Sequence, residues 1–122
     1  MPTTYFDNEM ITTDFPNRKF TSYLKKLNLK SSDELNLGDR HNILMMILDD
    51  FKSGKVCLDE LSAMSDYLWS TIHGKRDGEL ESVLLEAAEL SYYLRTITKE
   101  NPGNFLMFLI DILDYYQKHK KD

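Results

Sequence analysis

A glycine corner between two amphipathic stretches, within residues 39–72, is the feature that most constrains the fold. Before the corner, apolar residues recur at the three- and four-residue spacing of one helical face. They are Ile43, Leu44, Ile47, Leu48 and Phe51. Gly54 follows where a helix readily ends on a left-handed residue. A second apolar face then runs through Leu58, Leu61, Met64, Ser65, Leu68, Trp69 and Ile72. This spacing predicts two helices joined by a tight turn, with Asp39 as N-cap of the first.

Three further stretches have helical periodicity. The first begins near Asn17, and its inward face is Phe20, Tyr23, Leu24 and Leu27. The second spans about residues 78–98 after a cap at Asp77, with Leu80, Val83, Leu84, Ala87, Leu90, Ser91, Leu94 and Ile97 inward. The third begins near Pro102, with Phe105, Leu106, Leu109, Ile112, Leu113 and Tyr116 inward. The sequence thus predicts an all-α compact bundle of four main helices plus a short N-terminal helix. We expect one domain over residues 1–122, with 1–16 an extended N-terminal segment.

The composition is that of an ordinary globular protein, 42% hydrophobic and 29% charged. The N-terminus lacks a secretory pattern, and the longest apolar run, residues 105–110, is too short to span a bilayer. Cys57 is the single cysteine, which excludes an internal disulfide and suits a reducing compartment. These features predict a cytoplasmic protein without a membrane partner, and Cys57 is expected to be buried or half-buried.

The sequence contains no recognisable catalytic motif. His41, His73 and His119 lie in separate segments, and there is no His or Cys pair at zinc spacing. Cys57 has no neighbour in sequence that would activate it as a nucleophile. We therefore predict that the protein is not an enzyme and binds no cofactor.

The corner partly matches a calcium loop. Counted from Asp49, Gly54 and Glu60 occupy the sixth and twelfth positions of an EF-hand. The third position is Phe51, which has no side-chain oxygen and completes an apolar helix face. A plain helical corner is therefore favoured over a calcium site, and no metal site is predicted.

The net charge of −5 is concentrated in the middle of the chain. Residues 39–72 carry six acids against three bases, and residues 77–100 carry six against two. Such a field repels nucleic acid and attracts cationic proteins. The expected partner is therefore a cationic protein and not a nucleic acid.

Two predicted helices place their acids and two tyrosines on one side each. These candidate partner-binding residues are Asp59, Glu60, Asp66, Tyr67, Glu79, Glu86, Glu89 and Tyr93. Such faces are often only solvated surface. However, these acids have almost no Lys or Arg four residues away, which a merely solvated helix usually has. The tyrosines could provide the aromatic anchors common at interfaces.

The corner Phe51-Lys52-Ser53-Gly54-Lys55-Val56, followed by Asp59-Glu60-Leu61 and Trp69, resembles bacterial helical immunity proteins of the colicin D and contact-dependent inhibition type. Val56 stands where that family commonly has Ile, and Leu61 where an aromatic residue is common. The resemblance implies a stoichiometric inhibitor whose carboxylates occupy the cationic site of a tRNA-cleaving toxin.

We therefore expect an immunity protein or antitoxin that neutralises a basic, RNA-cleaving bacterial toxin domain through acidic helix faces. Met107, Phe108 and Ile110 widen the apolar surface of the last helix beyond one face. An alternative is thus a small regulatory adaptor, or a homodimeric helical protein, that binds a partner helix through an apolar groove.

Overall fold

The computed structural model describes residues 17–29, 35–72, 77–96 and 102–120. The chain divides into two compact units, residues 1–34 and 35–122. The described residues form five α-helices and no strand, which confirms the all-α prediction. The predicted extended segment, residues 1–16, lies outside the described residues.

The first unit contains α1 (Asn17–Lys26). Phe20, Tyr23 and Leu24 are buried, as their spacing predicts. Two residues after the helix, Asn28 has a φ of 60°, a left-handed value that asparagine tolerates. The N–H of Leu29 then donates to the carbonyl of Leu24 over 2.9 Å and closes the last turn.

The second unit begins with α2 (Leu37–Lys52). Its N-cap is Asn36, so the predicted cap at Asp39 is wrong by three residues. The Asn36 side chain accepts from the Asp39 N–H over 2.7 Å, and the Asp39 carboxylate accepts from the Asn36 N–H over 3.2 Å. This reciprocal capping box satisfies two backbone donors, whereas a cap at Asp39 would leave them to solvent.

The corner between α2 and α3 (Leu58–Ser70) has the predicted form. Gly54 adopts a φ of +85°, which disfavours any residue with a Cβ. Glu60 accepts a hydrogen bond from the N–H of Cys57 over 2.9 Å, so Cys57 is the N-cap residue of α3. Cys57 is exposed, contrary to the prediction, because the N-cap lies on the outside of the corner, before the apolar face of α3 begins.

Arg40 of α2 is a buried cation, only 4% exposed, at the C-terminal end of α3. Its guanidinium donates to the Leu68 carbonyl over 2.7 Å and to the Thr71 hydroxyl and carbonyl over 2.7 and 3.0 Å. Burial lowers the pKa of Arg40, and electrostatic interactions with Tyr67 and Asp39 oppose that shift. The side chain therefore satisfies terminal carbonyls that no helical N–H can reach.

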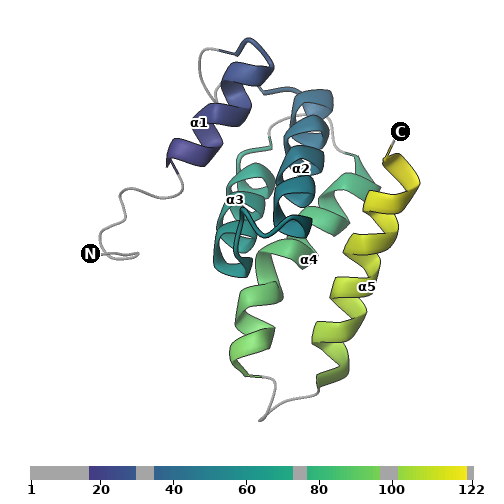
Figure 1. Ribbon diagram of the computed structural model, residues 1–122. Helices are drawn as coiled ribbons and strands as arrows, with labels where there is room; N and C mark the ends of the chain where they lie inside the picture. The colour runs from purple at the N-terminus through teal and green to yellow at the C-terminus, as the bar shows by residue number, and fades with distance from the viewer. Residues whose placement is uncertain (1–16, 30–34, 73–76, 97–101, 121–122) are drawn as a thin grey trace. The chain divides into compact units, whose positions relative to one another are not determined.

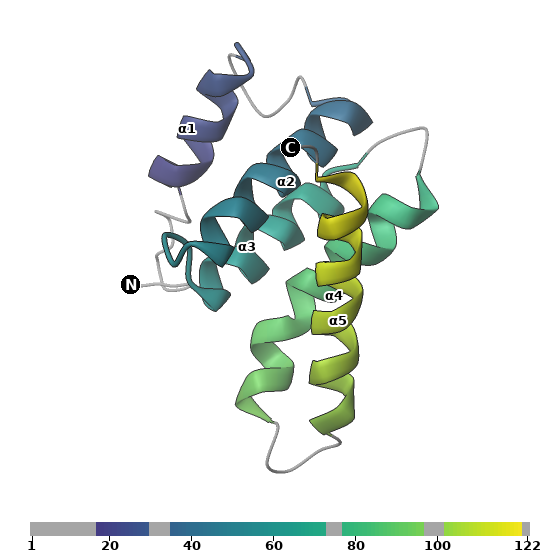
Figure 2. The ribbon, with the colours of Figure 1, turned by 45° about the vertical axis from the view of Figure 1, so that its right-hand side comes forward.

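Two longer helices complete the unit, α4 (Gly78–Arg95) and α5 (Pro102–His119). Asp77 caps α4 as predicted, accepting from the Leu80 N–H over 3.1 Å. In sequence order α2, α3, α4 and α5 each pack on the next, and α4 lies beside both α3 and α5 (Figures 1 and 2). Their core consists chiefly of Ile43, Leu44, Ile47, Leu48, Leu61, Met64, Leu68, Leu80, Val83, Leu84, Ala87, Leu90, Ile112, Tyr115 and Tyr116.

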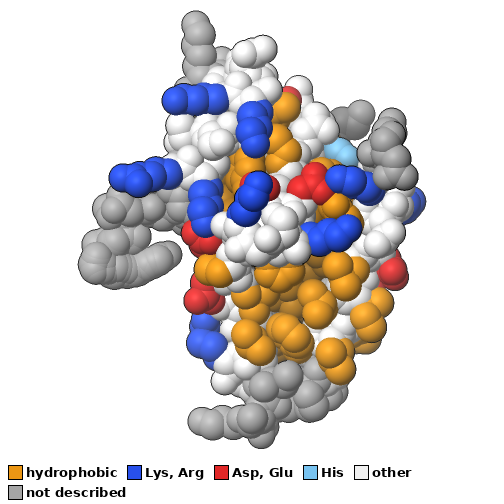
Figure 3. Space-filling model, in the orientation of Figure 1, with side chains coloured by type: hydrophobic (Ala, Val, Ile, Leu, Met, Phe, Trp, Pro, Cys, Tyr) orange, Lys and Arg blue, Asp and Glu red, His pale blue; other side chains and the backbone are white. Residues whose placement is uncertain are grey.

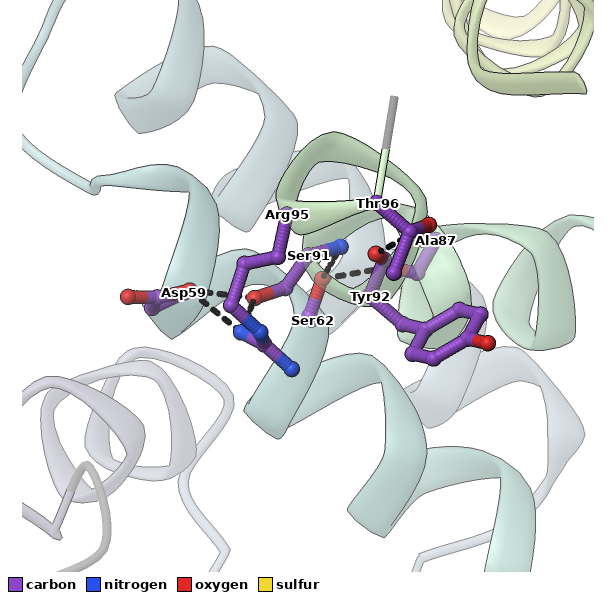
Figure 4. Close-up of polar contacts among 7 residues, drawn as sticks. All are labelled: Asp59, Ser62, Ala87, Ser91, Tyr92, Arg95 and Thr96. Carbon is purple, nitrogen blue, oxygen red and sulfur yellow. Dashed lines mark hydrogen bonds and ion pairs between the residues drawn. The ribbon is translucent and has the colours of Figure 1, made fainter. Parts of the chain in front are cut away.

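The hydroxyl of Ser62 on α3 is inserted into the hydrogen-bond ladder of α4 (Figure 4). It donates to the Ala87 carbonyl over 2.8 Å and accepts from the Ser91 N–H over 3.0 Å. Ala87 and Ser91 are four residues apart, so these two groups would otherwise bond to each other. A side chain inserted in this way bends a helix, and both ribbon views show α4 bent (Figures 1 and 2).

The bend determines where the second half of α4 lies. That half runs with the first half of α5 beyond the ends of α2 and α3 (Figures 1 and 2). Burial of α4 follows the same boundary, since Leu90 is fully buried and Leu94 is 45% exposed. We call α4 and α5 together the α4–α5 hairpin. In its far part these two helices pack only on each other among the described helices of the unit, because α2 and α3 do not reach it.

Candidate protein-binding surface on α4 and α5

Large apolar side chains are exposed on the α4–α5 hairpin. They are Leu85, Tyr92 and Leu94 on α4, and Leu106, Met107, Ile110 and Leu113 on α5. In the space-filling view, hydrophobic side chains form a broad patch over the far part of the hairpin (Figure 3). Large exposed apolar patches of this kind commonly mark sites of interaction with other molecules.

Leu106 and Leu113 were predicted to face inward but are 54% and 46% exposed. Their place in the α5 periodicity is correct, but no described helix of the second unit covers this part of α5. Ile112 and Tyr116, on the same predicted face, are buried. The prediction was wrong because periodicity identifies an apolar face and not whether a neighbour reaches it.

A groove of about 370 Å³ lies between α4 and α5, lined by residues other than the exposed apolar ones. Its lining is Glu79, Ser82, Val83, Glu86, Asp111, Asp114, Tyr115 and Lys118. Four carboxylates thus share one groove with a single lysine. The predicted acidic side of α4 therefore faces α5 along part of its length, because α4 packs on α3 and on α5 with different sides.

Glu86 and Asp111 are the closest pair of acids in this groove. Burial, followed by the charge of Asp111 and a hydrogen bond to it, raises the pKa of Glu86 to about 7. Glu89 adds a smaller repulsion that acts in the same direction. At neutral pH the Glu86 carboxyl is therefore protonated for part of the time. Within the described part of the chain, no lysine or arginine pairs with either carboxylate.

Two of the predicted partner-binding acids are already paired inside the protein. Glu79 lies 2.9 Å from the Lys118 amine and 3.6 Å from Nε2 of His119. Lys118 and the other groups around Glu79 lower the pKa of its carboxyl. Asp59 accepts a hydrogen bond from the Ser91 hydroxyl and lies 3.7 Å from the Arg95 guanidinium (Figure 4). The expectation that these acids lack cations is wrong for both residues, because the cations come from other helices and not from i+4.

The remaining predicted residues occupy several separate positions. Glu60 belongs to the α3 cap. Asp66 is exposed on α3, and partial desolvation by neighbouring atoms raises the pKa of its carboxyl. Tyr67 is half-buried. Tyr93 packs edge-on against Phe108 at a ring-centroid distance of 5.2 Å, joining α4 to α5. Of the eight predicted residues, Glu79 and Glu86 line the α4–α5 groove, whereas Asp59, Glu60, Asp66 and Tyr67 belong to α3.

The structure also joins two histidines that are distant in sequence. Nδ1 of His41 and the Tyr115 hydroxyl share a hydrogen bond of 2.6 Å, and the His41 and His119 rings are 4.9 Å apart at their centroids. Burial and then the neighbouring His119 lower the pKa of His41, and burial raises the pKa of Tyr115 to about 12. His41 and Tyr115 are therefore neutral at neutral pH, and the cluster joins α2 to α5.

Sequence reasoning missed Asp111, Asp114 and the His41–His119 contact. The two aspartates recur three residues apart on α5, a spacing that places them on one side of the helix. That signal was present, but it lay outside the acidic middle of the chain. The histidine contact has no local signal, because it depends on how α2 meets α5.

The described residues contain no group of three His, Cys, Asp or Glu that could hold a metal ion. Within the same residues, no helix combines the length and the apolarity needed to cross a bilayer. No family model matches the chain, and no curated protein or solved structure shows significant similarity to it. The arguments that follow therefore rest on the residues themselves.

Proposed function

We propose that this protein is a non-catalytic binding protein whose partner is a basic protein domain. The observation that carries the proposal is the Glu86–Asp111 pair, two carboxyls that share a groove and have no described cation between them. Without a nearby cation, the repulsion between two such carboxylates is relieved when one of them takes up a proton. A lysine or arginine from a partner would stabilise both carboxylates in the ionised form.

Asp114 and Glu89 extend the same acidic surface. Neither is paired with a described lysine or arginine, in contrast to Glu79 and Asp59. Like-signed groups on one surface increase the rate at which an oppositely charged protein is captured. The partner surface is therefore centred on Glu86 and Asp111 and not on the whole acidic middle of the chain.

The finer proposal is that the chain is an immunity protein or antitoxin for an RNA-cleaving toxin. Its support is the resemblance of residues 51–69 to immunity proteins of the colicin D type, together with this acidic surface. A nuclease that binds RNA presents lysines and arginines to phosphates. Carboxylates placed on those cations would exclude the substrate.

The test is co-expression of the chain with a panel of tRNA-cleaving toxin domains, followed by calorimetry on any pair that survives. We expect protection against at least one toxin. We expect the double variant Glu86→Lys/Glu89→Lys to bind that toxin about 100-fold more weakly or worse. Glu81→Lys changes the charge by the same amount per residue on a different side of α4 and serves as the control.

Protection against none of the toxins would reject the inhibitor proposal. Equal affinity of the wild type and the double variant would reject the proposed surface. Circular dichroism of each variant shows whether a loss of binding is merely a loss of fold.

A further inference from the structure

We infer that the exposed stripe on α5 is the contact between two copies of this chain. The stripe is made of Leu106, Ile110 and Leu113, which are 54%, 56% and 46% exposed. None of these three side chains lines the acidic groove, although Asp114 of the groove is the next residue after Leu113.

The spacing of the stripe fits a second helix. Intervals of four and three residues are those of d, a and d positions in a heptad. The stripe therefore has apolar residues at successive seam positions, Ile at a and Leu at d. An α5 helix that packs on its own copy would bury this seam from both sides.

The charges favour an antiparallel pair. Residues 102–110 contain no charged side chain, so two chains of net charge −5 can approach there without local repulsion. In a parallel pair Asp114 would lie level with Asp114 of the other copy. A two-fold axis at Ile110 instead places Leu106 beside Leu113 of the other copy, with Asp114 facing an uncharged part of the helix.

The area is sufficient for a reversible dimer. Five side chains contribute to it, the stripe together with Met107 and Leu94, each about half exposed. They provide roughly 500 Å² per copy, or roughly 1,000 Å² for the pair, which is near the lower limit for a specific interface. The uncharged stripe offers no charge complementarity to a basic partner, so a second copy fits it better than the cationic protein proposed above.

The test is sedimentation of the full chain over a range of concentrations. We expect a monomer–dimer equilibrium in the micromolar range that tightens as salt screens the net charge. Binding of a basic toxin would instead weaken with salt. Because salt changes the dimer affinity and the toxin affinity in opposite directions, either proposal can fail without the other.

Two variants test the symmetry. Ile110→Glu places two acids at the axis, and we expect dimerisation at least about 100-fold weaker. A mixture of Ile110→Glu and Ile110→Lys chains should recover the dimer, because each acid then meets a base. Leu85→Glu, on α4 and off the stripe, is the matched control and should dimerise like the wild type.

A chain that stays monomeric at every concentration would overturn the inference and leave the stripe to another occupant, such as a partner helix. A dimer that Ile110→Glu does not weaken, or that the mixed variants do not restore, would show that the copies meet elsewhere.

Discussion

The Ser62 hydroxyl on α3 accepts a hydrogen bond from the N–H of Ser91 on α4, over 3.0 Å. The same hydroxyl donates to the Ala87 carbonyl. One small side chain thus takes the place of a helical hydrogen bond and fixes the direction of the second half of α4. The exposed apolar surface of the hairpin follows from that direction.

Ser62→Ala should straighten α4. The Ala87 carbonyl and Ser91 N–H can then bond to each other, so we expect a loss of about 1 kcal/mol or less in unfolding free energy. Residual dipolar couplings would measure the angle between the two halves of α4, and urea titration the stability. Ser65→Ala is the control, because the Ser65 hydroxyl is buried without a hydrogen-bond partner in the described structure. A bend that persists in Ser62→Ala would show that the insertion does not cause it.

Arg40→Met should be among the most destabilising substitutions in the second unit. It removes three hydrogen bonds and takes the donor away from the buried Leu68 carbonyl and the part-buried Thr71 carbonyl, so we expect a loss of about 3 kcal/mol. Arg95→Met removes a guanidinium that is 66% exposed and should cost less than about 1 kcal/mol. Urea unfolding of both variants makes the comparison, and equal losses would contradict the capping role of Arg40.

Glu86→Gln should alter how stability depends on pH. Because the pKa of Glu86 is raised to about 7 in the folded chain, the protonated carboxyl favours folding at acidic pH. That contribution is lost as pH rises from the unfolded pKa, about 4.5, through about 7. The Gln side chain is neutral at every pH. The unfolding free energy of the variant should therefore rise relative to that of the wild type across this window and exceed it at pH 8. Thermal unfolding at pH 5 and pH 8 measures the difference in stability between variant and wild type, and an equal difference at both values would contradict the raised pKa of Glu86.

The His41 cluster should respond to its two kinds of neighbour in opposite directions. His119→Gln removes a positive charge that lowers the pKa of His41, so that pKa should rise. Asp77→Asn removes a negative charge that raises it, so the pKa should fall, while Asn still caps α4. NMR titration of the His41 ring follows both shifts, and shifts of the same sign would show that His41 is not held between these groups.

Acid should therefore weaken the α2–α5 contact. Because the folded pKa of His41 lies below its unfolded value, its contribution to stability is complete above the unfolded pKa. It is lost as pH falls through the lowered folded pKa.

A Tyr115→Phe variant removes the 2.6 Å hydrogen bond between Tyr115 and His41. It should cost about 1 kcal/mol of unfolding free energy at neutral pH, measured by urea unfolding.

Most of the helices could be predicted from the sequence. The corner at Gly54, the cap at Asp77 and the start of α5 at Pro102 all depend on local backbone preferences. The cap of α2 was misplaced because Asn36 and Asp39 are both good caps, and only the reciprocal bonding distinguishes them.

The candidate site was less predictable because it depends on how the helices meet. Periodicity placed Glu79 and Glu86 on one side of α4 but could not show that Lys118 reaches the first and Asp111 the second. The exposure of Leu106 depends on how far α2 and α3 extend and on the bend at Ser62. None of these relationships is encoded within a few residues of the side chain concerned.

The acidic residues of the second unit fall into two groups, those paired with a cation of the protein itself and those without such a pair. Asp59 and Glu79 each pair with a cation on another helix, so replacing either one removes a contact within the protein. Glu86, Asp111 and Asp114 form no ion pair with a described lysine or arginine, so replacing them removes no internal salt bridge. If the proposed partner surface is correct, sequences that bind different basic partners should differ first at those three positions.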